Sequence, residues 1–100
     1  MGSPIRMTRT TRDVLETLQA ATSRNDATYG LEICKVTGLG PGTVYPILTR
    51  LERVGWVRAY WAEDDTRGPR RRMYELTGEG VSAIQAVEAT APSARPRWAQ

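Results

Sequence analysis

The chain has 100 residues, of which 40% are hydrophobic and 25% are charged, a composition typical of one small globular domain. The 14 basic residues outnumber the 11 acidic residues, an excess that is compatible with a nucleic-acid partner but does not require one. No apolar run is long enough for a membrane span, and no segment resembles a signal peptide. The sequence therefore predicts a cytoplasmic protein with no membrane partner.

The residues that most enzymes use for catalysis are scarce in this chain. Histidine is absent and Cys34 is the single cysteine, so neither a Ser-His nor a Cys-His relay can form. One cysteine cannot form an internal disulfide, and no zinc site is expected without histidine. Cys34 lies in an apolar-periodic stretch, which favours a small buried side chain over a reactive thiol. We therefore predict no enzymatic activity, no cofactor and no metal.

Two helices are predicted in the first 40 residues. Residues 1–9 show little periodicity and are predicted to be a flexible tail. A helix over residues 11–22, with Thr10 or Thr11 as its N-cap, is indicated by apolar residues at helical spacing: Val14, Leu15, Leu18 and Ala21. A short second helix is predicted between Thr28, as its cap, and Gly38.

A glycine-rich segment, residues 38–42, follows the second helix. It could be a phosphate-binding loop, but no strand precedes it, its spacing differs from the known phosphate-loop patterns and no lysine follows. A turn between helices is the better interpretation. The third helix is then predicted to start at Thr43 as N-cap, which places Pro46 in the first turn, where its missing N–H is tolerated. Its apolar stripe is formed by Val44, Ile47, Leu48, Leu51 and Val54, and Gly55 ends it.

The second half of the chain predicts a hairpin and a last helix. Residues 56–61 and 70–76 have the composition of strands, and residues 63–69 form a polar loop between them. Thr77 is expected to cap a fourth helix that carries Val81, Ile84, Val87 and Ala91. Residues 92–100 are predicted to be a flexible tail rich in Pro, Ala and Arg.

This order of elements is that of a winged helix-turn-helix, an α+β and mainly helical fold with three helices, a two-stranded β-wing and a C-terminal helix. Residues 10–77 form the predicted DNA-binding domain, and residues 78–91 form a C-terminal dimerisation helix. Because successive residues advance about 100° around a helix, the apolar stripe of the third helix leaves a polar face opposite. The residues predicted to contact DNA from this helix are Thr43, Tyr45, Pro46, Thr49, Arg50 and Arg53.

The hairpin carries a basic cluster near Gly68 and Pro69. Arg67, Arg70 and Arg71, with Arg72 beside them, could reach phosphates or a minor groove, and the first three are predicted DNA contacts. Alternatively, these arginines pair with the acidic residues on the other limb of the loop, 63–65, in a solvated hairpin. Both interpretations can hold together. Three adjacent loop acids are a poor candidate for a metal site.

Several short motifs resemble the PadR family of bacterial transcriptional regulators. The central match is residues 42–48, continued by residues 50–52 and 55–57; the others are residues 29–33, Trp61, Glu63, Arg72, Tyr74, Leu76, Thr77 and Gly80. The resemblance covers roughly residues 12–84. It implies a repressor that binds an inverted-repeat operator in double-stranded DNA as a homodimer and can be released by a small-molecule effector. Because little sequence follows the fourth helix, the chain resembles the short-tailed members.

A homodimer is also favoured by the fourth helix itself, since its apolar stripe comes after the winged core is complete. The predicted interface pairs this helix with the first helix of the partner and includes Val14, Leu18, Val81, Ile84 and Val87. The alternative is that the fourth helix folds back on the first helix of its own chain. Two other functions remain open: a winged helix that docks another protein, and a small-molecule sensor with a pocket lined by Trp56, Trp61 or Trp98.

Overall fold

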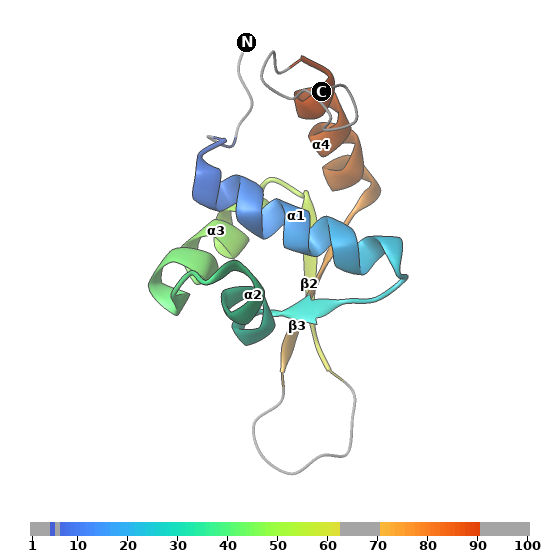
Figure 1. Ribbon diagram of the computed structural model, residues 1–100. Helices are drawn as coiled ribbons and strands as arrows, with labels where there is room; N and C mark the ends of the chain where they lie inside the picture. The colour runs from blue at the N-terminus through green and yellow to red at the C-terminus, as the bar shows by residue number, and fades with distance from the viewer. Residues whose placement is uncertain (1–4, 6, 63–70, 91–100) are drawn as a thin grey trace.

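The computed structural model describes residues 5, 7–62 and 71–90 of the chain. Three helices pack together beside a small sheet, and a fourth helix leaves the sheet on the side opposite the wing (Figure 1). The elements in chain order are α1 (Arg9–Ser23), β1 (Thr28–Tyr29), α2 (Gly30–Thr37), α3 (Pro41–Arg53), β2 (Val57–Trp61), β3 (Arg72–Leu76) and α4 (Gly78–Thr90). The predicted winged helix-turn-helix is confirmed, with α2 and α3 as its helix-turn-helix and β2 and β3 as its wing.

The hydrophobic core lies where α1, α2 and α3 meet the inner face of the sheet. The apolar stripe of α1 is buried there as its spacing predicted, and the stripe of α3 packs against it. The side chains with no exposed surface include Val14, Leu18, Ile33, Val44, Leu48 and Leu51. Val57 and Leu76 cover the core from the sheet. This packing fixes the orientation of α3 and decides which of its side chains face outward.

The sheet has three strands, one more than the sequence predicted. The central strand β3 pairs antiparallel with β2 and with β1, in the order β1-β3-β2. Thr28 was predicted to cap the second helix, but it lies in β1 opposite Tyr74 and is buried. A two-residue strand has no periodicity of its own, and pairing with β3 is what defines it. Tyr29 is the N-cap residue of α2 instead, and Gly38 ends α2 as predicted.

The first helix begins before its predicted start. Thr8 is its N-cap, with a side-chain oxygen that accepts a hydrogen bond from the Thr11 N–H at 3.2 Å. The helix therefore begins at Arg9, inside the segment that was predicted to be a tail. Ile5 is also buried in the core, and Met7 packs against it. Residues 1–4, 6 and 91–100, where the rest of the predicted tails fall, lie outside the described residues.

The start of α3 corrects a second boundary. Gly40, not Thr43, is the N-cap, and Pro41 is the first helical residue, where a missing N–H leaves no bond unmade. Pro46 consequently lies inside the helix rather than in its first turn. Because proline has no N–H, the Gly42 carbonyl receives no helical hydrogen bond from residue 46. Pro41, not Pro46, is therefore the proline in the first turn of this helix.

The junctions around the wing follow the prediction more closely. Gly55, after the end of α3, has the left-handed φ of 85° that favours glycine at this position. The Thr77 side chain accepts a hydrogen bond from the Gly80 N–H at 3.0 Å, so Thr77 caps α4 as predicted. The same hydroxyl donates to the Gly55 carbonyl at 2.6 Å and joins the two ends of the wing. None of the described helices is both long and apolar enough to cross a membrane.

Candidate nucleic-acid interface

The outer face of α3 is polar, basic and accessible. Burial of the apolar stripe turns the opposite face outward, and all six residues predicted to contact DNA from this helix are exposed: Thr43, Tyr45, Pro46, Thr49, Arg50 and Arg53. The Thr49 hydroxyl donates to the Tyr45 carbonyl at 3.0 Å, which leaves its oxygen free to accept a hydrogen bond. Two arginines in the last turn and hydroxyls along the face provide donors for phosphates and base edges.

Tyr45 is held in place by a close contact with α2. Its side chain is 37% exposed, and its ring lies against Gly30, the first residue of α2. A Cβ atom at position 30 would lie 2.2 Å from the Tyr45 hydroxyl oxygen, much closer than two such atoms can approach. Position 30 therefore has to be glycine for the tyrosine to keep this orientation. Gly30, in the motif of residues 29–33, thus leaves room for the ring of Tyr45 on the exposed face of α3.

Beside Tyr45, the base of the wing carries two arginines stacked on aromatic rings. The guanidinium carbon of Arg71 lies 4.9 Å from the centre of the Tyr29 ring, and that of Arg72 lies 5.0 Å from the centre of the Trp61 ring. Arg71 is exposed, as expected of a DNA contact. Arg67 and Arg70, the other predicted contacts of the wing, lie outside the described residues, as do the acidic residues 63–65.

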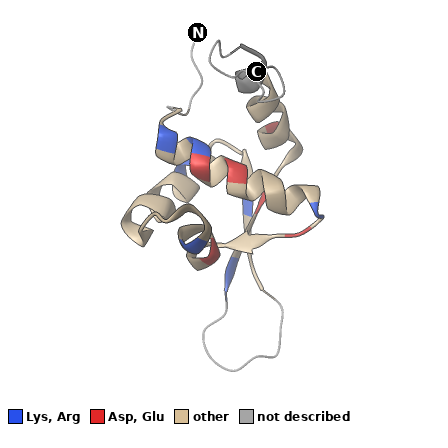
Figure 2. Ribbon diagram, in the orientation of Figure 1, with Lys and Arg blue, Asp and Glu red and all other residues tan. Residues whose placement is uncertain are grey.

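The sequence did not indicate a binding role for Tyr29, whereas Arg72 was expected beside the predicted DNA contacts of the wing and Trp61 was a candidate to line a ligand pocket. The pairing of β2 with β3 places Trp61 directly opposite Arg72. This register depends on where the loop between the two strands begins and ends, and the sequence pattern did not define those bounds. Figure 2 shows basic residues at the end of β3 nearest the hairpin loop, and both basic and acidic residues along α1.

An ion pair connects α3 to the wing. Arg72 Nη2 lies 3.4 Å from a Glu52 carboxylate oxygen, and Glu52 belongs to the last turns of α3. Tyr74, two residues along β3, is buried beneath this pair. Burial raises the pKa of the Tyr74 hydroxyl because the charged phenolate is poorly solvated there, and the nearby Arg72 guanidinium acts in the opposite direction.

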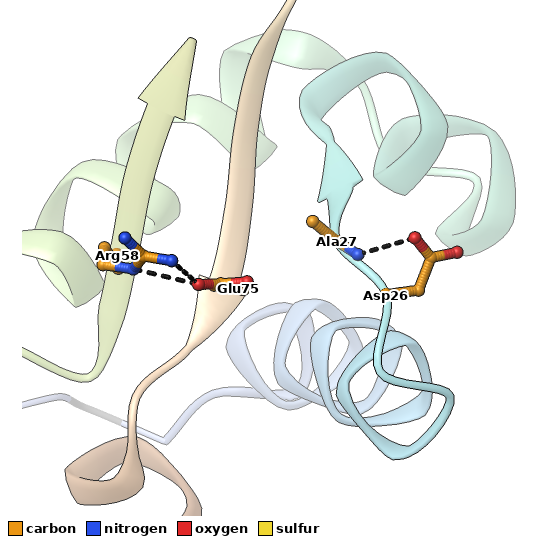
Figure 3. Close-up of polar contacts among 4 residues, drawn as sticks. All are labelled: Asp26, Ala27, Arg58 and Glu75. Atoms are coloured by element: carbon orange, nitrogen blue, oxygen red, sulfur yellow. Dashed lines mark hydrogen bonds and ion pairs between the residues drawn. The ribbon is translucent and has the colours of Figure 1, made fainter. Parts of the chain in front are cut away.

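A third arginine of the wing has a different environment. Arg58 on β2 forms an ion pair with Glu75 on β3 (Figure 3), and its guanidinium also lies 5.1 Å from the centre of the Tyr60 ring. The hydrogen bond with Glu75, followed by the charge of this carboxylate, raises the pKa of Arg58. The strand register places this pair on the face of the sheet opposite Trp61 and Arg72. Figure 3 also shows the Asp26 carboxylate accepting the Ala27 N–H at 2.9 Å in the turn before β1.

Comparison with known proteins agrees with this geometry. The model of the transcriptional regulator PadR-like family matches residues 18–86. The chain belongs to this family. It is a family of transcription regulators, not of enzymes, which confirms the predicted absence of enzymatic activity. No curated protein matches this PadR-like chain at a significant level.

Solved structures resemble the PadR-like chain over most of its length. A PadR family transcription regulator from Clostridium difficile R20291 is 25% identical, with a TM-score of 0.68 over 82% of this chain and 85% of the other. A PadR-like transcription factor from Bacteroides fragilis is 32% identical, with a TM-score of 0.61 over 79% and 78% of the two chains. S. aureus MepR in complex with DNA is 26% identical, with a TM-score of 0.68, and the similarity covers 83% of this chain but 63% of MepR.

The predicted dimer contacts of the PadR-like chain need correction. Val14 and Leu18 have no exposed surface in the single chain, because they fill the core between α1 and the sheet. Ile84 is buried as well, and Val81 packs partly against the core. These side chains therefore stabilise the monomer and have little surface left for a partner. The side chain of Val87 lies outside the described residues.

The tryptophans bear on the alternative of a small-molecule sensor. Trp56 is buried in the core, whereas Trp61 is 51% exposed at the base of the wing. Trp98 lies outside the described residues. Cys34 packs against the core, in agreement with its interpretation as a small apolar side chain. Among the residues that the structure describes, no cluster of His, Cys, Asp and Glu could hold a metal ion.

Proposed function

We propose that this PadR-like regulator is a homodimeric repressor that binds an inverted-repeat operator and is released by a small-molecule effector. The observation that supports it best is the outer face of α3. A helix whose inner face is packed into the core presents hydroxyls, a fixed tyrosine and two arginines to solvent, next to an arginine-bearing wing. This is the arrangement that places one helix in a major groove while the wing contacts the flanking backbone.

The exposed residues divide into two roles. Tyr45, Thr49 and Arg50 lie along the helix face and are proposed to contact base edges, whereas Thr43, near the start of α3, is proposed to bind a phosphate. Pro46 and Arg53 complete the surface that meets DNA. Arg67, Arg70 and Arg71 of the wing are proposed to bind phosphates and to supply affinity that does not depend on sequence.

Helix α4 is the proposed dimerisation element, within residues 78–91. Its first turns pack against β3 and the core, and Ser82 and Gln85 on its other side are exposed and available to a second copy. A two-fold axis through this region would set two copies of α3 about 34 Å apart, one turn of DNA, as reading an inverted repeat requires. The partner surface on α1 must come from its outer face, since Val14 and Leu18 are buried.

Selection of bound sequences from a random double-stranded DNA library tests the proposal directly. We expect one palindrome to be enriched, with half-sites one helical turn apart. Arg50→Ala should weaken binding to that palindrome by about 1–3 kcal/mol. Arg24→Ala is the matched control, because Arg24 is an exposed arginine at the end of α1, outside the proposed interface. Absence of enrichment would exclude sequence-specific binding.

The wing is tested by the salt dependence of binding. Each phosphate contact adds about 0.9 to the slope of log K against log salt concentration. Replacing both Arg70 and Arg71 by alanine should flatten this slope and weaken binding to all sequences similarly. A change of sequence preference at constant slope would instead mean that the wing reads bases.

Sedimentation at micromolar concentration tests the dimer. We expect a species of twice the chain mass, and we expect substitution of Ser82 and Gln85, two exposed residues of α4, by arginine to favour the monomer through charge repulsion. A wild-type monomer that binds single half-sites would contradict the dimer and leave the DNA-binding role intact. Repression and effector release are tested with a reporter gene placed behind the selected palindrome.

A further inference from the structure

A cleft of about 380 Å³ lies between the start of α2, the helix α3 and the base of the wing. Its walls combine cationic, aromatic and apolar side chains from all three elements, and they include Arg71, Arg72, Trp61, Tyr45 and Leu31. Leu31 is 62% exposed at the rim and Trp61 is 51% exposed. The cleft opens beside the outer face of α3, so that a DNA strand seated along that face would pass over it.

The two arginines of the cleft are pre-organised by aromatic rings. Arg71 lies over Tyr29 and Arg72 lies over Trp61, each guanidinium within cation–π range of the ring centre. A guanidinium stacked on a ring keeps all its N–H donors in the plane and directed outward, so it loses less side-chain entropy when it binds an anion. The rings therefore act on the arginines rather than on a ligand of their own.

Arg72 is held from more than one side. Besides Trp61, it contacts Glu52 of α3 at 3.4 Å and lies close to the hydroxyl of Tyr74. The contact with Glu52 is long for an ion pair of this kind and partly exposed, so the guanidinium keeps donors for another oxygen. Among the described residues, no carboxylate pairs with Arg71, whereas Arg58 is paired with Glu75. The cleft therefore brings together Arg71 and an Arg72 that keeps donors beyond its contact with Glu52.

We propose that this cleft binds a phosphodiester group of one DNA strand, with Arg71 and Arg72 as its donors and Tyr29 and Trp61 as positioning residues. The proposal rests on the DNA-binding role proposed above and adds a contact that joins α3 to the wing. Two guanidiniums suit a phosphate, which accepts bidentate hydrogen bonds from arginine. The exposed apolar surface of Leu31 suits the adjoining deoxyribose, which carries no charge.

The salt dependence of binding to a 30-base-pair duplex of mixed sequence tests this phosphodiester site, because a phosphate contact needs no particular bases. We expect Arg72→Gln to lower the slope of log K against log salt concentration by about 0.9. Trp61→Ala should lower it in the same direction and weaken binding about two- to fivefold, and Trp61→Phe, which keeps an aromatic face, should restore both. Tyr60→Ala is the matched control, since it removes the ring beneath Arg58 on the opposite face of the same strand.

A double-mutant cycle decides whether Trp61 acts through Arg72. The variant with both Trp61→Ala and Arg72→Gln should bind no more weakly than Arg72→Gln alone. The phosphodiester site would be overturned by an unchanged salt slope in Arg72→Gln, by additive losses of affinity in the cycle, or by equal losses of affinity in Trp61→Ala and Tyr60→Ala. Binding of DNA by the wild type would still support the proposed function in each case. A wild-type chain that fails to bind any duplex would overturn both. Arg72→Gln changes a partly exposed side chain, so its slope can be measured even if Trp61→Ala proves unstable.

Discussion

The helices α3 and α4 are each 13 residues long, but the fold holds them very differently. Four side chains of α3 are buried in the core, namely Val44, Ile47, Leu48 and Leu51. Helix α4 is fixed mainly near its first turns, where Gly80 and Ile84 are buried, and it extends away from the body of the fold (Figure 1). The helix proposed to meet DNA is held in one orientation by core packing along most of its length. The helix proposed to meet a second copy is anchored at one end.

The start of α4 is held by contacts with the segment that joins α3 to β2. The Trp56 carbonyl accepts a hydrogen bond from the Thr77 N–H at 3.0 Å, and Gly80 lies directly against this carbonyl. Thr77 caps the helix and bonds to Gly55 at the end of α3. The direction of α4 relative to α3 is thus fixed by these backbone contacts together with the apolar side chains of its first two turns, Val81, Ala83 and Ile84.

The largest difference between the two helices is expected in the free energy of unfolding when a buried side chain of α3 is truncated. Leu48→Ala removes a side chain with no exposed surface and should lower the free energy of unfolding by about 2–5 kcal/mol, independently of protein concentration. Gln85→Arg at an exposed position of α4 should cost much less in a monomer, and its effect should grow with protein concentration if α4 forms the dimer. Urea denaturation at two protein concentrations measures both. Equal, concentration-independent losses would contradict the comparison.

The anchor of α4 is tested at its glycines. A Cβ atom at position 80 would lie 2.1 Å from the Trp56 carbonyl oxygen, so Gly80→Ala must displace the start of the helix. We expect a loss of about 1–3 kcal/mol in the free energy of unfolding. Gly78→Ala is the matched control, because a Cβ at position 78 meets nothing within 4 Å. If both variants melt at the same temperature, the contact between α4 and Trp56 does not anchor the helix.

The outer face of α3 is tested at Gly30. Gly30→Ala should push the Tyr45 ring out of its position and weaken binding to the selected operator about tenfold, roughly 1.4 kcal/mol. The effect should be absent in a Tyr45→Ala background, where the added methyl group has no ring to displace. Fluorescence anisotropy with labelled operator measures the four affinities of this cycle. A loss of the same size in both backgrounds would show that Gly30 acts on folding rather than through Tyr45.

The smallest expected effect concerns pH and the contact between α3 and the wing. Because burial raises the pKa of Tyr74 above its unfolded value near 10, the hydroxyl must remain protonated in the folded state. The stability that depends on it is fully present below about pH 10 and is lost as the pH rises toward the folded pKa. Tyr74→Phe should therefore remove part of the alkaline loss of stability. Unfolding curves between pH 8 and pH 11 of the wild type and the variant, if parallel, would contradict this.

The pattern of the sequence was sufficient for most of the architecture. Apolar residues recur every three to four positions in α1 and α3 because each helix buries one face. This periodicity predicted both helices and the exposed face of α3. Thr77 and Gly55 were predictable for a local reason, since a hydroxyl cap and a left-handed residue act within their own turns. The family resemblance rested on the same residues, and the family was confirmed.

The features that the sequence did not predict depend on residues far apart in the chain. Strand β1 exists because β3 pairs with it, and Arg72 meets Trp61 because of the register of β2 and β3. Gly30 serves Tyr45 through a contact between two helices. Val14 and Leu18 were assigned to a dimer because periodicity shows that a face is apolar but not what covers it, and the sheet of the same chain covers it. Local hydrogen bonding and periodicity are encoded residue by residue, whereas the partner of each face is decided only when the whole chain packs.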